Sequence, residues 1–182
     1  AASLQKTASA LSKKMTVAYG GRIFNLQPDI SKHIAGHHLG NDMVQAVNEI
    51  ENVLGGKGNK IRVASTPKEH LEAHKFFSSN RAEIEGTVRK LIKPMLDLNE
   101  EIQTGIHFLG DNIAAALQLG DLNYVSDEMT WIKHLLHAHK RPSEELLGFM
   151  DAYTRAIAKH MDSAGKPIEA WLKQEIKKLK TT

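Results

Sequence analysis

The chain has 182 residues, of which 41% are apolar and 25% charged, and its net charge is +3. These proportions are typical of a folded globular protein with one sizeable core or two small helical bundles. No apolar run approaches the length that a bilayer requires, so no transmembrane segment is expected. The sequence contains no cysteine, which excludes disulfides, thiolate nucleophiles and cysteine-bound metal and fits a cytoplasmic location.

Basic residues gather at both ends of the chain. The first 28 residues contain four basic side chains and no acid, and lysine is frequent in the last ten. Proteins that read DNA usually cluster arginine in a recognisable motif, and no clear nucleic-acid motif is present here. The lysines are therefore interpreted as solvated termini that keep the chain soluble.

The N-terminal third is predicted to contain little regular structure. Residues 1–28 are expected to form an arm or a short helix, broken at Tyr19-Gly20-Gly21, with Arg22 to Gln27 extended. A helix is predicted from Asp29 to Leu54, with Gly36 and Gly40 interrupting its first half. Residues 29–182 are then expected to form a single helical domain.

The remaining two thirds of the sequence also have the apolar spacing and the terminal residues typical of helices. Thr66-Pro67-Lys68-Glu69 is a typical helix start, and that helix is expected to continue towards Lys93. Gly120-Asp121 is a natural helix end and restart, and Ser143 and Pro167 open two further helices. The chain therefore predicts an all-α fold, a bundle of about seven mostly antiparallel helices in a globin-like or double four-helix arrangement.

Residues 107–150 are predicted to be the centre of this bundle. Apolar side chains recur there at alternating spacings of three and four, on one face of a helix: Leu122, Val125, Met129, Ile132 and Leu136, with His139 at the end. A second row, which includes Tyr124 and Trp131, lies beside this face. An apolar stripe this wide has to be covered by helices on both flanks.

Ten histidines are the most unusual feature of the composition. Potential ligands recur one helical turn apart in the pairs His33/His37, His70/His74 and His107/Asp111. Such pairs on facing helices could hold a metal ion, a haem or another tetrapyrrole. The spacing matches neither a zincin nor a ferritin-like di-iron motif, however, and the sequence requires no cofactor.

A ligand pocket is the other interpretation of the same region. His70, His74 and Phe77 share one face of their helix, so they could line a pocket or simply pack with the core. Tyr124 and Trp131 could stack on a planar ligand or pack at a core or subunit interface. These five residues are the candidate ligand-binding set.

The central stretch also resembles a known family of helical domains. The residues that carry the resemblance are Ala116-Leu117, Gly120-Asp121, Asp127, Trp131, Leu135-Leu136, Pro142, Glu144 and Leu146. Their order is similar to that of the helical domains that accompany corrinoid-binding domains in bacterial regulators and methionine-synthase-like proteins. The corrinoid motif of such proteins, Asp-x-His-x-x-Gly, has Ser31 in place of its aspartate here, followed by His33 and Gly36. The resemblance therefore implies a regulatory or ligand-sensing module more than a bound corrinoid.

These patterns together predict a non-enzymatic ligand-binding or sensory module, because no nucleophile elbow, phosphate loop or paired catalytic carboxylates are found. The expected partners are a second copy of the chain in a homodimer, a small apolar or planar ligand, and a protein partner. The alternative is a haem, tetrapyrrole or metal-binding helical protein that uses the paired histidines.

Overall fold

The computed structural model describes residues 2–57, 63–95, 100–126, 129–130, 132–134 and 142–181. Helices account for most of these residues, which confirms the predicted all-α class. Chain contacts divide the molecule into two compact units, Ala1–Thr66 and Pro67–Thr182. The boundary predicted after Pro28 lies inside the first unit, where the helical turns on either side of this proline pack against each other. No helix of the described chain is long and apolar enough to cross a membrane.

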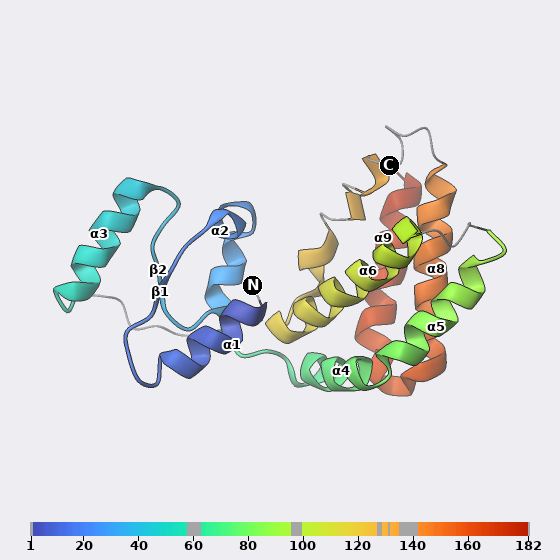
Figure 1. The fold of residues 1–182 in the computed structure, drawn as a ribbon, viewed down its shortest axis with the longest axis horizontal. Helices are drawn as coiled ribbons and strands as arrows, with labels where there is room; N and C mark the ends of the chain where they lie inside the picture. Colours follow the sequence, from blue (N-terminus) through green and yellow to red (C-terminus); the bar gives the residue numbers. More distant parts are fainter. Residues whose placement is uncertain are drawn as a thin grey trace. The chain divides into compact units, whose positions relative to one another are not determined.

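The first unit combines short helices with one small pair of parallel strands (Figure 1). Its elements are α1 (Ala2–Leu11), β1 (Ala18–Tyr19), α2 (Arg22–Leu26), the 3-10 helix η1 (Pro28–His33), β2 (His37–His38) and α3 (Met43–Leu54). The prediction that Arg22 to Gln27 is extended is wrong, because these residues form α2. Its Phe24 is buried beside the rings of Tyr19 and His38, at centroid distances of 5.0 and 5.2 Å, and this aromatic packing favours a helical turn.

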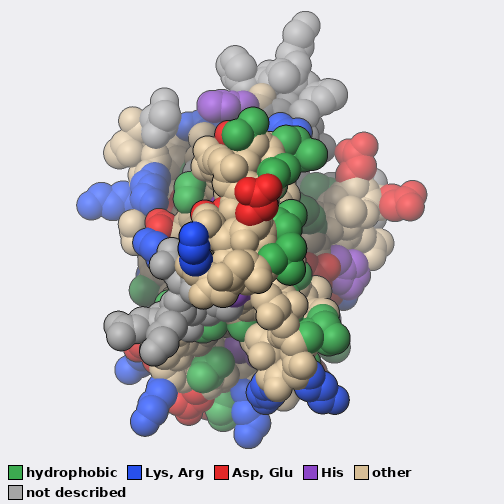
Figure 2. All heavy atoms as spheres, turned by 90° about the vertical axis from the view of Figure 1, so that its left-hand side faces the viewer, with side chains coloured by type: hydrophobic (Ala, Val, Ile, Leu, Met, Phe, Trp, Pro, Cys, Tyr) green, Lys and Arg blue, Asp and Glu red, His purple; other side chains and the backbone are tan. Residues whose placement is uncertain are grey.

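The helix predicted from Asp29 to Leu54 is also divided in the structure. Gly36 and Gly40 adopt φ angles of +149° and +81°, which glycine tolerates and a helix does not. The chain therefore leaves η1, pairs as β2, and starts α3 afresh at Asp42, whose carboxylate accepts a hydrogen bond from the Gln45 amide at 2.8 Å. None of the residues of α3 is buried, and Figure 2 shows hydrophobic side chains along this helix at the surface.

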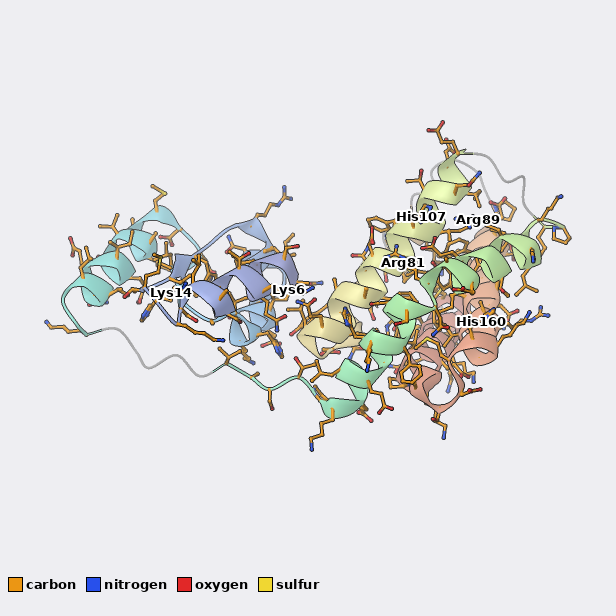
Figure 3. All side chains as sticks on the ribbon, turned by 60° about the horizontal axis from the view of Figure 1, so that its bottom comes forward. Lys6, Lys14, Arg81, Arg89, His107 and His160 are labelled. Atoms are coloured by element: carbon orange, nitrogen blue, oxygen red, sulfur yellow. The ribbon has the colours of Figure 1, made fainter. Side chains whose placement is uncertain are left out.

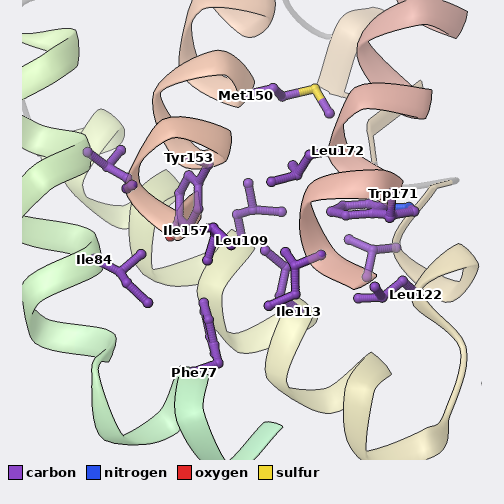
Figure 4. Packing of buried hydrophobic residues seen from close by; sticks show 14 of the residues in the cluster. Phe77, Ile84, Leu109, Ile113, Leu122, Met150, Tyr153, Ile157, Trp171 and Leu172 are labelled. Carbon is purple, nitrogen blue, oxygen red and sulfur yellow. The ribbon is translucent and has the colours of Figure 1, made fainter. Parts of the chain in front are cut away.

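The second unit contains the large core. Its elements are α4 (Lys68–Ser79), α5 (Arg81–Ile92), α6 (Glu100–Leu119), the 3-10 helix η2 (Leu122–Val125), α8 (Ser143–His160), the 3-10 helix η3 (Asp162–Gly165) and α9 (Lys166–Thr181). Helix α8 packs against both α5 and α9, and α6 packs against α4 and α5. Figure 4 shows side chains from these helices meeting in one cluster, with Phe77, Leu109, Tyr153 and Leu172 among them.

The local pattern predicted several features of this unit. As periodic helices require, α8 buries one face at Met150, Tyr153 and Ile157, and α9 buries Ile168, Trp171, Leu172 and Leu179. Gly120 ends α6 with a φ of +93°, and the Asp121 carboxylate accepts from the Asn123 amide at 2.8 Å, as a helix restart requires. The helix expected from Thr66 to Lys93 is instead two helices, α4 and α5, separated at Asn80.

The predicted central helix is described only in part. Leu122, Val125 and Met129 are buried, and Ile132 packs against the core, so the described residues of the predicted stripe do face inwards. Trp131, Leu136 and His139 lie outside the described residues.

Candidate ligand-binding site

A pocket of about 540 Å³ lies in the second unit, between the first turns of α4, the turn after α6, and the start of α9. Its lining comes from four segments of the chain: Glu69, His70 and Glu72; Asp121, Leu122 and Asn123; Ser163 and Ala164; and Lys166, Pro167, Ala170, Trp171 and Gln174. The volume is within the range of small-molecule sites in proteins.

His70 is the predicted site residue that lines this pocket. Its Nδ1 atom lies 2.7 Å from the backbone oxygen of Gly120, which can only accept a hydrogen bond. In the neutral ring Nδ1 therefore carries the proton, and Nε2 is the acceptor. No protein partner contacts Nε2 within the described residues, so this atom is available to a ligand.

More acidic than basic side chains are found among the described residues that line the pocket. Among these described residues, Glu69, Glu72 and Asp121 carry carboxylates and Lys166 carries an ammonium group. Such an arrangement favours a positively charged guest, because each carboxylate accepts hydrogen bonds and attracts a cation.

The apolar part of the pocket includes Trp171, whose ring is held in place by hydrogen bonds. Trp171 Nε1 donates to Ser126 Oγ at 3.2 Å, and Ser126 Oγ donates to Glu175 Oε1 at 3.0 Å. Glu175 is buried, and its charge is compensated by Lys178 Nζ at 2.6 Å. Trp171 is 5% exposed, so it forms a small and rigid part of the apolar pocket wall.

A polar network lies elsewhere in the second unit, where α5 and α6 pack together. Figure 3 shows Arg81, Arg89 and His107 close to one another at this contact. Glu85 is 3% exposed, and its carboxylate lies 2.7 Å from Arg81 Nε, 2.7 Å from His107 Nδ1 and 3.5 Å from Arg89 Nη2. Arg81 also binds Asp111 Oδ1 at 2.7 Å and the backbone oxygen of His107 at 2.9 Å.

This network of ion pairs connects α5 to α6. A Cβ atom added at Gly110 would lie 3.0 Å from Arg81 Nη2 and 3.1 Å from Glu85 Oε1, so the glycine leaves room for the ion pairs beside α6. The Glu85 carboxylate thus lies between the side chains of Arg81, Arg89 and His107 and joins α5 to α6.

Three other predicted ligand-binding residues, His74, Phe77 and Tyr124, are not part of the pocket lining. Phe77 is fully buried in the core, where Figure 4 shows it below Leu109 and Ile113. His74 is half-buried one turn after His70 on α4, and Tyr124 packs against the core cluster. Trp131 lies outside the described residues.

The predicted metal ligands are distributed over both units. His33 ends η1 and His37 lies in β2, so this pair does not occupy one helical turn. His70 and His74 do share one turn of α4, and His107 shares one turn of α6 with Asp111. Among the described residues, no group of three or more histidine, aspartate or glutamate side chains is placed to hold a metal ion.

Most of the residues that line the pocket could not be predicted from the sequence. The sequence marks Asp121 and Pro167 as residues at helix starts, but a local pattern does not show that these two helix starts lie side by side.

Comparison of the chain with protein-family models, curated proteins and solved structures gives no match. The resemblance to corrinoid-associated helical domains therefore stays a prediction.

Proposed function

We propose that the chain is a non-enzymatic binding module that takes up a small organic amine with a planar apolar part in the pocket at His70. The observation that carries this proposal is the pocket itself, in which a histidine, three carboxylates and a fixed tryptophan line a space of about 540 Å³. Sites of this size commonly join an apolar wall to a few polar groups that orient the ligand.

The polar groups support an amine as the ligand. With Nδ1 donating to the Gly120 oxygen, a neutral form of the His70 ring would present Nε2 as an acceptor, and the carboxylates of Glu69, Glu72 and Asp121 accept when ionised. An ammonium group donates three hydrogen bonds and carries the charge that these acids attract. A carboxylic acid of the same shape would be repelled by them, with Lys166 as its only cationic partner in the pocket lining.

The apolar groups support a planar body. Pro167 lines the pocket beside Leu122 and Trp171, which are each 5% exposed, and an aromatic ring can lie against a proline ring. A ligand in this place would connect α4 to α9, whose starting turns both line the pocket. A sensory role follows from this bridge, because binding would alter how tightly the two helices are held together.

Tryptamine and indole-3-acetate form a suitable pair of probes, since they share the indole ring and differ in charge. At a concentration of about 100 times Kd, tryptamine should stabilise the wild-type protein by about 2.7 kcal/mol and raise Tm by roughly 5–10 °C, while indole-3-acetate should have little effect. The same titration followed by amide NMR should shift Asn123 and Ala170, two residues of the pocket lining.

Two matched variants control this experiment. Ala170→Trp fills the pocket and should abolish the tryptamine effect, whereas Ala158→Trp, at an exposed position of α8, should preserve it. The proposal is wrong if neither probe binds, if both bind equally, or if Ala170→Trp binds tryptamine as the wild type does.

A haem, tetrapyrrole or metal site is the second candidate, favoured by the placement of His70 and His74 one turn apart on α4. An absorption spectrum and a metal analysis of the protein from its native source test it directly. A chelator that lowers the wild-type Tm and leaves the His70→Gln/His74→Gln double variant unchanged would establish a structural metal. We expect the chelator to affect neither protein.

We also propose that the helices are arranged either in a globin-like order or as a double four-helix bundle. The packing of α4 against α6 and of α4 against α9 is compatible with either arrangement.

A further inference from the structure

Helix α3 presents an apolar face that no described residue of the first unit covers. Met43, Val47, Ile50 and Leu54 recur at spacings of four, three and four, and they are 79%, 51%, 42% and 82% exposed. The helix rests on its unit through a neighbouring side, where Ala46, Glu49 and Val53 are partly buried. Figure 2 shows the hydrophobic side chains as a stripe along this helix, with an acidic side chain beside them.

An exposed stripe of this kind is unusual in a folded unit, since contiguous apolar surface generally marks a contact with another molecule. Most of the large hydrophobic side chains that are exposed in the described chain belong to residues 1–66. The second unit, by contrast, buries its apolar residues in one cluster.

The charge on α3 restricts what can cover it. Glu49 and Glu51 lie on the helix, and no lysine or arginine occurs between Met43 and Leu54. Neither glutamate forms an ion pair within the described residues, so a basic partner would find both carboxylates unpaired.

The same unit carries a surface with the opposite charge. Directly after α1, Lys13 and Lys14 lie between Leu11 and Met15, which are 40% and 59% exposed. Figure 3 labels Lys14 in this segment. The first 28 residues contain no acid, and neither lysine is in an ion pair within the described part of the chain.

We propose that a second copy of this chain covers α3. In this dimer, α3 of one protomer packs on the Leu11–Met15 segment of its partner, so that apolar side chains meet and glutamates face lysines. A two-fold axis makes this contact twice, once in each direction. Packing α3 on α3 instead would bring acidic residues of the two copies together, and this arrangement is electrostatically less favourable. The dimer uses no residue of the pocket at His70.

Sedimentation equilibrium of the full chain tests the proposal, with circular dichroism to confirm that each variant is folded. The wild type should be dimeric at micromolar concentration. Val47→Glu places a charge in the apolar face and should weaken dimerisation at least about tenfold. Glu51→Lys and Lys14→Glu should each weaken it several-fold, and more strongly at low salt.

The double variant Glu51→Lys/Lys14→Glu gives the decisive result, because it restores opposite charges across the proposed contact. It should dimerise more tightly than either single variant, while Glu83→Lys, at an exposed position of α5, should behave as the wild type. A monomeric wild type overturns the proposal. A dimer that tolerates Val47→Glu, or charge variants that the double variant does not rescue, overturns it as well.

Discussion

The buried carboxylates of Glu85 and Glu175 are each compensated by neighbouring side chains. Glu85 is surrounded by Arg81, Arg89 and His107, and Glu175 is matched by Lys178 and Ser126. Tyr153 is fully buried in the core, and its hydroxyl donates to the backbone oxygen of Ile106. Since an unpaired buried polar group costs stability, such partners are what allow these side chains to lie inside.

Tyr153 should make stability depend on pH in the alkaline range. Burial, assisted by the negative charge of Glu85, raises the pKa of Tyr153 above its ordinary value of 10.0. The unfolded chain therefore releases this proton at a pH at which the folded chain still holds it. The stabilisation is fully present below pH 10 and is lost as pH rises above it.

Tyr153→Phe removes this dependence. Urea denaturation between pH 8 and 11.5 should show the free energy of unfolding falling more steeply for the wild type, by up to about 1.4 kcal/mol per pH unit above the tyrosine pKa. At neutral pH the variant should lose about 1 kcal/mol with the hydrogen bond. Parallel curves for the two proteins would contradict the raised pKa.

At the scale of the elements, glycine acts in different ways along the chain. Gly36 and Gly40 divide the predicted long helix because their φ angles are positive. Gly105 and Gly110 lie inside α6 without breaking it, since the helix is held on both sides by packing. Gly165, at the junction of η3 and α9, has no room for a side chain: a Cβ atom there would lie 2.8 Å from Ile157 Cγ2 and 3.0 Å from Met161 Cβ.

Gly165→Ala should therefore destabilise the second unit by about 1–3 kcal/mol, because the core has to move to admit the methyl group. Gly86→Ala is the matched control. No atom lies within 4 Å of a Cβ added at Gly86, and alanine in the middle of α5 should stabilise by about 0.5–1 kcal/mol. Thermal denaturation of the three proteins measures both effects; equal Tm values for the two variants would show that Gly165 is not tightly packed.

At the scale of the whole molecule, the two units differ in how they are held together. The large core cluster runs from Ala73 to Leu179 and lies wholly in the second unit. The first unit buries a smaller set: Ala8, Tyr19, Phe24, Ile30, Ile34 and Ala35. A unit with so few buried side chains gains less from the hydrophobic effect than the larger one.

The second unit should accordingly fold without the first. We expect residues 67–182, produced alone, to unfold in a single cooperative thermal transition and to keep the tryptamine response of the full chain. Residues 1–66 produced alone should show a weaker and broader transition. A fragment 67–182 without a cooperative transition would show that its core depends on contacts with the first unit.

The sequence by itself determined the all-α class and several local features of the second unit. The helix end at Gly120 follows from the backbone freedom of glycine, and the inward faces of α8 and α9 follow from periodicity, both of which act over a few neighbouring residues. Only the tertiary structure decided that Arg22–Leu26 is helical, since this depends on the aromatic contact of Phe24 with Tyr19 and His38. It also decided that the apolar face of α3 is exposed and that Glu69, Asp121 and Lys166 line one pocket. Periodicity shows which side of a helix is apolar, but which helices meet depends on how the whole chain packs.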